Sequence, residues 1–300
     1  MKIYLNCPSC NSNNYSKYIS ANVSKVRVDK YSAGSDDKLS EDLSKCLDCD
    51  LIYMNPQPEI NSIISGYSEA IDEYFTSQDT FRVISSEKYI KMMLKKKYLN
   101  KNSRVLDVGS GSGSFLKALK NYKIYGQGIE PSKWLAKYSI EKYNLLIHSG
   151  TISTFTPIHK NNKFNVVTFW DVLEHIQNLN ECLDDVSKHL ENEGLLVINF
   201  PDHDSLIRKI LRHNWPFYLN VHLNYFTKKT LNSLLEKHNY KNIIYKPYYQ
   251  YLSLGYTLKR ASNYFIVFKF LYKLVSILKL NNIKIKYNMG QTLGIFKLEK

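Results

Sequence analysis

The stretch Val105–Phe115 reads VLDVGSGSGSF and places glycines at alternate positions after an acid that ends an apolar run. The residues of this pattern are Asp107, Gly109, Gly111 and Gly113. Glycine lacks a Cβ atom, so such a loop lets the backbone approach a ligand closely. A dinucleotide loop requires a third glycine where Ser114 stands, and a phosphate loop requires a lysine after its last glycine. The spacing therefore fits neither of these ligand classes.

A second acid ends the next apolar run. Glu130 follows Gly109 by twenty-one residues, at the end of a predicted strand. A carboxylate in this place can accept hydrogen bonds from both hydroxyls of a ribose. The loop and the acid together predict a nucleoside-containing cofactor.

Four of the five cysteines form two C-x-x-C pairs. These pairs are Cys7 with Cys10 and Cys46 with Cys49. Four thiolates satisfy the tetrahedral geometry of zinc, and a reducing compartment opposes disulfides, so the pairs predict a Zn²⁺ site. The fifth cysteine, Cys182, lies in a helical pattern and is expected to be a small buried side chain.

From Arg104 onward, apolar runs alternate with helical patterns. The predicted strands are 104–109, 123–131, 145–150, 164–171, 195–201, 241–250 and 292–298. The predicted helices are 113–122, 132–143, 178–194 and 227–240, with Gly194 ending the third and Thr227 capping the fourth. Continuous apolar runs separated by helices indicate a largely parallel sheet covered on both faces. The fold class is therefore α/β.

The D-x-G-x-G-x-G pattern resembles motif I of class I S-adenosylmethionine-dependent methyltransferases. The resemblance implies a Rossmann-like sandwich with a mostly parallel seven-stranded sheet, and S-adenosylmethionine as the cofactor. Asp107 would then help to hold the ammonium end of the cofactor, through a water molecule or through the loop. Glu130 would bind the ribose.

The segment FNVVTFWDVLEHIQN resembles the fourth-strand motif of the ubiquinone-type methyltransferases. That resemblance implies that Phe169, Trp170 and Asp171 form a wall of the cofactor site. The third strand lacks the acid that many relatives place near the adenine amino group, so adenine contacts are expected from the backbone near Thr151 and Ile152.

The cysteine module followed by CLDCDLIYMNPQPE, and the later HNWPFYLNVHLNYF, resemble a bacterial subgroup of these enzymes in surface-polysaccharide and deoxysugar pathways. The resemblance implies O-methylation of a sugar or a lipid-linked glycan during cell-surface polysaccharide biosynthesis. Two alternatives stay open: an RNA methyltransferase and a non-catalytic S-adenosylmethionine-binding protein. An RNA enzyme would commonly show an N-P-P-Y type motif where this chain reads FWDVLEH, so a nucleic acid is not the expected partner.

Two histidines are candidate general bases for a hydroxyl acceptor. His222 lies in an H-x-x-Y-F stretch that resembles one in deoxysugar C-methyltransferases, where the histidine is the base. Those relatives have a second histidine where this chain has Asn220, which makes carbon methylation doubtful. His175, in the stretch LEH, is the second candidate, with a structural role as the alternative.

The sequence divides into three predicted parts, and the sites above lie in the first and the third. Residues 1–52 form a zinc-ribbon-like module with a mobile loop, 53–103 a linker with helices, and 104–300 the methyltransferase domain, with a lid at about 202–226 and an amphipathic insertion at about 257–287. The formal net charge of +14 favours acidic partners. No signal sequence or spanning run appears, so the protein is expected in the cytoplasm, with a possible peripheral contact to the inner membrane surface.

Overall fold

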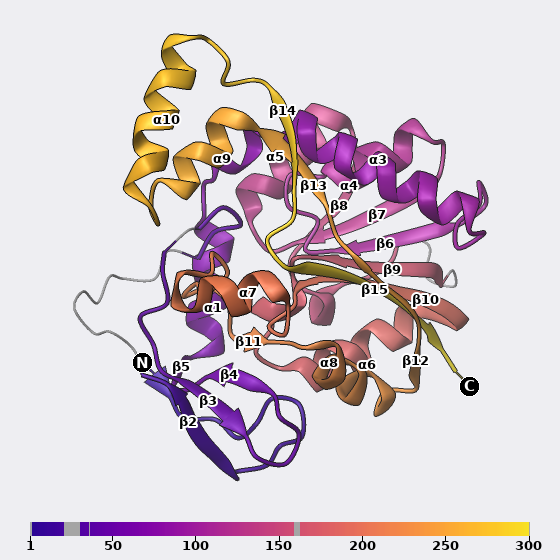
Figure 1. The fold of residues 1–300 in the computed structure, drawn as a ribbon. Coiled ribbons are helices and arrows are strands. Elements are labelled where there is room, and N and C mark those ends of the chain that lie inside the picture. Colours follow the sequence, from indigo (N-terminus) through magenta and orange to yellow (C-terminus); the bar gives the residue numbers. More distant parts are fainter. Residues whose placement is uncertain (1, 21–30, 36, 159–162, 300) are drawn as a thin grey trace.

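A seven-stranded sheet forms the centre of the molecule (Figure 1). The computed structural model describes residues 2–20, 31–35, 37–158 and 163–299. In spatial order the strands are β12 (Tyr240–Pro247), β15 (Gln291–Leu298), β10 (Leu190–Pro201), β9 (Phe164–Trp170), β6 (Arg104–Val108), β7 (Tyr125–Glu130) and β8 (Leu146–Ser149). Strand β15 runs antiparallel to both of its neighbours, β10 and β12, and the other four strand pairs of this sheet are parallel. The predicted Rossmann-like, mostly parallel seven-stranded sheet is therefore confirmed.

Helices cover both faces of this sheet. The helices α3 (Asp79–Lys95), α4 (Ser114–Asn121) and α5 (Lys133–Tyr143) lie on one face, and α6 (Leu179–His189) and α8 (Lys228–Glu236) on the other. Alternate strand residues point to opposite faces: Leu106 packs in the cluster that contains the α6 and α8 side chains, whereas Val105 packs in the cluster of α3 and α4. The apolar runs of the sequence follow from this double coverage.

One helix end differs from its prediction. Thr227 caps α8 as expected, since its side chain accepts a hydrogen bond from the backbone N–H of Thr230. Gly194, however, does not end α6, which stops at His189. Leu190 is already extended, fully buried and paired with Phe164 of β9. Burial of Leu190 in the sheet therefore ends the helix, and the glycine lies in β10 where the register shifts.

The N-terminal module is built from short strands. They are β1 (Lys2–Ile3), β2 (Tyr15–Ile19), β3 (Leu43–Cys46), β4 (Ile52–Met54) and β5 (Gln57–Pro58). A strand from the predicted lid, β11 (Asn224–Tyr225), pairs with β4 and so completes the module's four-stranded sheet. Residues 21–30 of the predicted loop lie outside the described residues. The module and the lid are therefore joined by backbone hydrogen bonds.

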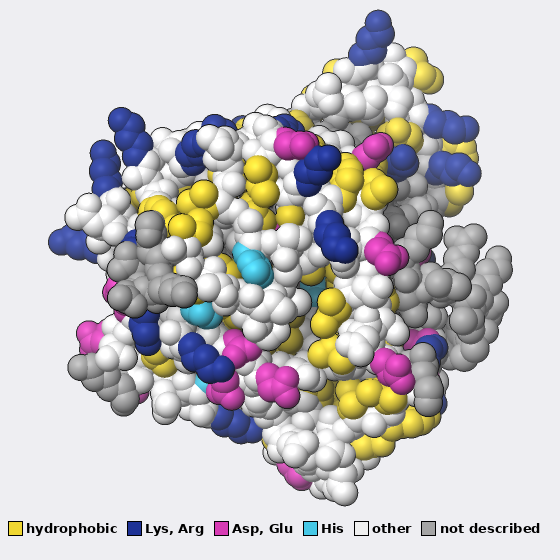
Figure 2. All heavy atoms as spheres, turned by 180° about the vertical axis from the view of Figure 1, so that it is seen from behind, with side chains coloured by type: hydrophobic (Ala, Val, Ile, Leu, Met, Phe, Trp, Pro, Cys, Tyr) yellow, Lys and Arg dark blue, Asp and Glu magenta, His cyan; other side chains and the backbone are white. Residues whose placement is uncertain are grey.

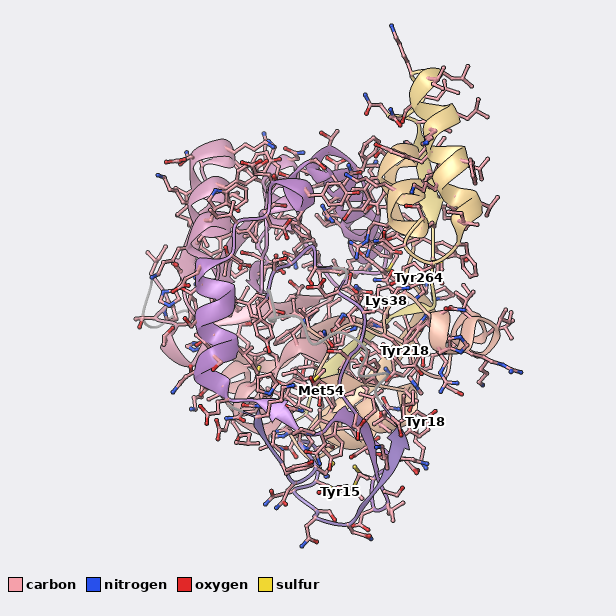
Figure 3. The ribbon with its side chains drawn as sticks, turned by 90° about the vertical axis from the view of Figure 1, so that its left-hand side faces the viewer. Tyr15, Tyr18, Lys38, Met54, Tyr218 and Tyr264 are labelled. Atoms are coloured by element: carbon pink, nitrogen blue, oxygen red, sulfur yellow. The ribbon has the colours of Figure 1, made fainter. Side chains whose placement is uncertain are left out.

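Helices α1 (Ile60–Glu69) and α2 (Glu73–Thr76) connect this module to α3. Between β12 and β15 the chain forms β13 (Gln250–Ser253), α9 (Leu254–Ala261), α10 (Ile266–Ile277) and β14 (Lys284–Tyr287). Helix α10 projects from the body of the molecule, at the end opposite the N-terminal module (Figures 1 and 3). Within the described ranges, no helix has the length and apolar character needed to cross a membrane.

Candidate functional site

The glycine loop connects the end of β6 to the start of α4. Gly109, Gly111 and Gly113 all adopt positive φ angles, of 68°, 54° and 75°. A side chain is disfavoured in this left-handed region, which explains the alternating glycines. A Cβ atom on Gly113 would also lie 2.5 Å from the Leu145 side chain. The loop is therefore a tightly wound turn that exposes backbone at the sheet edge.

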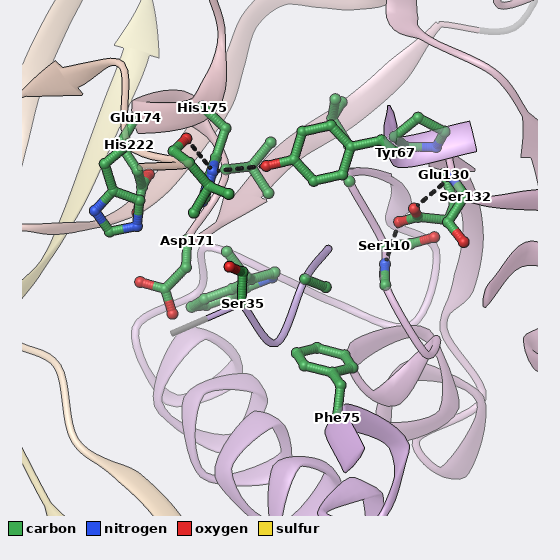
Figure 4. Close-up of a pocket in the computed structure, with 18 of the residues that line it drawn as sticks. Ser35, Tyr67, Phe75, Ser110, Glu130, Ser132, Asp171, Glu174, His175 and His222 are labelled. Carbon is green, nitrogen blue, oxygen red and sulfur yellow. Dashed lines mark hydrogen bonds between the residues drawn. The ribbon is translucent and has the colours of Figure 1, made fainter. Parts of the chain in front are cut away.

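Glu130 is tied to this loop by its carboxylate. The backbone N–H of Gly111 donates to Oε2 at 2.7 Å, and that of Ser132 donates to Oε1 at 2.8 Å (Figure 4). The side chain is buried, and burial raises its pKa to about 7. Each carboxylate oxygen has a further lone pair, so the group can still accept bonds from a ligand.

Asp107 is the second buried acid of the loop region. The hydroxyl of Thr168, on the neighbouring strand β9, donates to its Oδ1 at 2.6 Å. Burial, together with a smaller contribution from the nearby Glu130, raises the pKa of Asp107 to about 7. The adjoining parallel strands β6 and β7 thus carry Asp107 and Glu130 at or next to their last residues. Among the described residues, no cation offsets the charge that either carboxylate bears when it is ionised.

These groups face a cavity of about 550 Å³. Its wall contains Asp107, Gly109, Gly111 and Glu130, together with Trp170 and Asp171 from the end of β9. The predicted adenine contacts, Thr151 and Ile152, line it as well. Most of the predicted cofactor residues therefore come together in one place.

Two predicted cofactor residues are absent from the cavity wall. Gly113 packs against Leu145 and Ser139 at the start of α4. Phe169 is fully buried in the core beneath the sheet, on the face covered by α6 and α8. Strand alternation explains Phe169, since its neighbour Trp170 points to the opposite face and reaches the cavity.

Asp171 is oriented by two glutamines. Gln291 donates to Oδ1 at 2.6 Å and Gln250 donates to Oδ2 at 3.0 Å. Burial raises the pKa of Asp171 to about 6. The glutamines come from β15 and β13, so the late strands of the chain fix a side chain at the middle of the cavity.

The far part of the cavity holds a cluster of Glu174, His175 and His222 (Figure 4). One candidate ligand atom from each of these residues lies within 4.8 Å of the others. The two imidazole rings are nearly perpendicular, with centroids 4.7 Å apart. The group has the donors and the spacing to hold one cation or to share one proton. Both predicted histidines are therefore brought together, next to an acid for which the sequence suggested no catalytic role.

Hydrogen bonds define the tautomer of both histidines. Nδ1 of His222 lies 2.8 Å from the carbonyl oxygen of Phe217, and Nδ1 of His175 lies 2.8 Å from that of Val221. A carbonyl only accepts, so Nδ1 carries the proton and Nε2 carries the lone pair. Burial lowers the pKa of His175 to about 4 and holds that of His222 well below its usual value. Burial therefore favours the neutral form of both rings.

Glu174 lines the cavity, although the sequence indicated no functional role for it. It is buried, and neither carboxylate oxygen has a hydrogen-bond partner among the described residues. Burial raises its pKa well above the usual range, and the nearby Asp171 raises it further. A buried carboxyl group without partners is costly, which points to a proton or a polar ligand in this part of the cavity.

The N-terminal helices close the cavity with residues that no sequence motif indicated. Tyr67 of α1 lies with its hydroxyl 2.9 Å from Nδ1 of His175, and Phe75 of α2 faces Gly111 (Figure 4). The guanidinium of Arg82 stacks on the Phe75 ring at 3.7 Å from its centroid. These residues stand in helices that precede the glycine loop and belong to no recognised motif, so nothing in the sequence distinguished them from packing residues.

The residues present fit S-adenosylmethionine, which carries an ammonium and a sulfonium charge. The cavity contains four acids whose pKa values are raised by burial: Asp107, Glu130, Asp171 and Glu174. A cationic ligand would offset the cost of ionising those beside the loop. Ser110, in the same wall, has a buried hydroxyl without a partner among the described residues. This donor set suits an amino acid end and a ribose.

The cysteine pairs form a second candidate site, away from the cavity. The Sγ atoms of Cys7, Cys10, Cys46 and Cys49 lie within 4.8 Å of one another, and none is in a disulfide. Each pair wraps the same turn: the backbone N–H of Asn11 donates to the Cys7 carbonyl, and that of Asp50 to the Cys46 carbonyl. Both turns end in a left-handed residue. The arrangement is consistent with a small zinc ribbon.

Comparison with solved structures gives similar chains of low identity. A SAM-dependent methyltransferase from Archaeoglobus fulgidus is 20% identical, covers 75% of this chain and 100% of its own, with a TM-score of 0.48. Magnesium protoporphyrin IX methyltransferase from Synechocystis, solved with bound SAH, is 10% identical. The match covers 81% of this chain and 89% of that enzyme, with a TM-score of 0.48. Among curated proteins, an uncharacterized protein of Methanocaldococcus jannaschii is 25% identical over 61% of this chain and 82% of its own length.

A family model gives the clearest match. The model is described as a methyltransferase domain, and it matches residues 78–244, more than half of the chain. The matched segment contains the glycine loop, Glu130 and the Glu174–His175 stretch. The chain therefore belongs to the family of methyltransferase domains, and it is a class I S-adenosylmethionine-dependent methyltransferase.

Proposed function

We propose that the protein O-methylates a hydroxyl group of a sugar or a lipid-linked glycan in cell-surface polysaccharide biosynthesis. The observation that supports this most directly is the cluster of Glu174, His175 and His222 in the same cavity as the glycine loop. Alkylation of a neutral hydroxyl requires removal of its proton, and a neutral imidazole with a lone pair on Nε2 can accept it.

S-adenosylmethionine, when bound, supplies a methyl group on a sulfonium sulfur. Asp107, Gly109, Gly111 and Glu130 would hold it against the end of the sheet. His222 takes the acceptor proton at Nε2, while its Nδ1–H remains bonded to the Phe217 carbonyl. An ionised Glu174 would stabilise the imidazolium that forms, as carboxylates do beside catalytic histidines.

The rest of the acceptor side suits a sugar. Aromatic side chains line it, and flat rings offer faces on which the C–H groups of a sugar can stack. They are Tyr67, Phe217, Tyr256, Tyr264 and Tyr287. Arg260 also lines this part and is suited to a phosphate or carboxylate group of the acceptor. Walls that exclude water from the reacting centre would keep it from competing for the methyl group.

We further propose that Cys7, Cys10, Cys46 and Cys49 hold one Zn²⁺ ion with a structural role. Their donor set is complete, so such a site leaves no open position for a substrate. The ribbon would stabilise the lid strand β11, which follows His222 by two residues. Its contribution to catalysis is therefore indirect.

Calorimetric titration with S-adenosylmethionine and S-adenosylhomocysteine tests the cofactor site. We expect micromolar binding by the wild type, and affinity weaker by about 10- to 100-fold in Glu130→Gln, because the charged acceptor of the ribose hydroxyls is lost. Asn165→Ala, at the far end of β9, is the control and should bind as the wild type does. Absence of binding by the folded wild type would contradict the cofactor assignment.

An acceptor screen tests the rest of the proposal. Nucleotide sugars, lipid-linked sugars and short RNAs are incubated with the wild type and S-adenosylmethionine, and products are identified by mass spectrometry and by the position of the new methyl group. Methylation of a sugar oxygen is the expected result. Transfer to RNA, or to nitrogen or carbon of any acceptor, would overturn the proposed specificity without affecting the cofactor site.

A further inference from the structure

Helix α10 presents an uncovered apolar face. Ile266, Phe270 and Ile277 are 68%, 66% and 77% exposed, whereas a soluble helix usually buries such side chains. The neighbouring exposed apolar residues are Val267, Leu271, Leu274 and Leu278. At the angular spacing of an α-helix, these seven residues share one arc of about 140°. The face is continuous and covers the full length of the helix.

The opposite side of α10 is already packed. Phe268, Tyr272 and Val275 are half-buried and point toward α9, on which α10 rests. The helix therefore does not need its exposed face for attachment to the protein. Figure 2 shows the same projection from behind, with apolar and basic side chains together on its surface.

The charges around this face have one sign. Lys269 and Lys273 lie at one edge of the apolar arc, and Lys279 follows the helix. Residues 254–287 contain seven lysines and arginines and no aspartate or glutamate. An apolar face bordered only by cations is complementary to an anionic lipid surface, where apolar side chains enter the acyl boundary and lysines contact head groups.

The face adjoins the acceptor side of the cavity. Arg260, Ala261 and Tyr264, which lead into α10, belong to the cavity wall. Tyr264 is held at the base of the projection, where the Lys38 ammonium lies 4.5 Å from its ring centroid (Figure 3). A surface that receives α10 would therefore lie next to the part of the cavity where the acceptor is expected.

We infer that α10 binds the surface of an anionic membrane and holds the acceptor side of the cavity against it. The apolar face provides the insertion, the lysines provide the preference for anionic lipids, and α9 connects the helix to the cavity wall. The delivery of a lipid-carried acceptor rests on the proposed function, but binding of the bilayer does not.

Vesicle flotation with the full-length protein tests this inference. The vesicles consist of phosphatidylcholine alone or of phosphatidylcholine mixed with phosphatidylglycerol. We expect binding to the mixed vesicles, much weaker binding to the neutral ones, and a loss of binding as salt is raised. Phe270→Ser/Ile277→Ser should reduce the partition at least about tenfold, because two exposed apolar side chains no longer insert.

Matched variants distinguish the effect of α10 from the effect of removing exposed apolar side chains elsewhere on the surface. Ile140→Ser/Leu146→Ser removes two exposed apolar side chains from α5 and β8 and should bind vesicles as the wild type does. Lys269→Glu/Lys273→Glu, at exposed positions, should reduce binding to mixed vesicles only. Calorimetric titration with S-adenosylmethionine should be unchanged in all three, so failure of the membrane inference is distinguishable from failure of the cofactor site.

Several results would overturn the inference. These are no binding of the wild type to mixed vesicles, equal binding to neutral vesicles, or undiminished binding by the α10 variant. Light scattering provides one more: if the wild type is a dimer, the α10 variant a monomer, and vesicles bind neither, the face joins two copies of the chain instead.

Discussion

At the residue scale, the buried acids determine how the cofactor site responds to pH. Burial raises the pKa of both Asp107 and Glu130 to about 7, from ordinary values near 4. Between these values the folded protein binds more protons than the unfolded chain, so its stability without a ligand falls as the pH rises through that window. A cationic ligand favours the ionised carboxylates and reverses this effect.

Affinity for S-adenosylmethionine should therefore increase as the pH rises from about 6 to about 8, by up to about tenfold for each carboxyl group that must ionise. Calorimetric titration across this range measures the change. Glu130→Gln should show a shallower dependence, because one of the two titrating groups is gone. An affinity that is independent of pH, or that falls, would contradict the assigned roles.

The histidine cluster gives a second prediction at this scale. His222→Gln should lower kcat by about 10²- to 10⁴-fold, since the proton acceptor is removed, while the Kd for S-adenosylmethionine stays unchanged. Glu174→Gln keeps the shape of the side chain but cannot ionise to stabilise the imidazolium, so it should also lower kcat. The measurement is methyl transfer to the acceptor found in the screen. Equal loss in cofactor binding would show a structural role instead.

At the scale of elements, two glycines of the same loop have different neighbours: Gly111 faces the cavity, and Gly113 packs inside the protein. Gly111 lines the cavity, and a Cβ atom there would lie 3.3 Å from the Phe75 ring. Gly113 lies outside the cavity wall, and its Cβ atom would lie 2.5 Å from Leu145. Both are left-handed, so both substitutions carry the same kind of backbone cost and differ in what the new methyl group meets.

Gly113→Ala should lower the free energy of unfolding by about 2 to 4 kcal/mol, through backbone strain and overpacking. Gly111→Ala should cost only about 1 to 2 kcal/mol but weaken cofactor binding at least about tenfold, because the added methyl narrows the cavity. Urea denaturation and calorimetric titration on the same samples measure the two effects. The reverse ranking would show that Gly113, not Gly111, borders the ligand.

At the scale of the whole molecule, a strand from the methyltransferase domain completes the sheet of the N-terminal ribbon. This strand, β11, pairs with β4 of the ribbon and begins two residues after His222. Leu223 also donates its backbone N–H to the Glu174 carbonyl. The position of the cluster of Glu174, His175 and His222 therefore depends on the integrity of the ribbon.

Cys46→Ser should abolish stoichiometric zinc and lower the melting temperature, since metal binding and folding of a ribbon are coupled. Elemental analysis and thermal unfolding measure these effects. Methyl transfer should fall more than cofactor affinity, because the ribbon supports the acceptor side. Cys182→Ala is the control and should retain its zinc. Full zinc content in Cys46→Ser would contradict the predicted ligand set.

The sequence by itself determined the parts of the protein that depend on local spacing. The glycine loop, Glu130 and the cysteine pairs each occupy a short stretch, and the ends of parallel strands must meet at one edge of the sheet. The tertiary structure alone decided which distant residues share the cavity. Glu174 and His222 come from different loops, and Tyr67 and Phe75 come from helices before the sheet. Contacts of this kind arise from packing across the whole chain, which no local pattern of residues encodes.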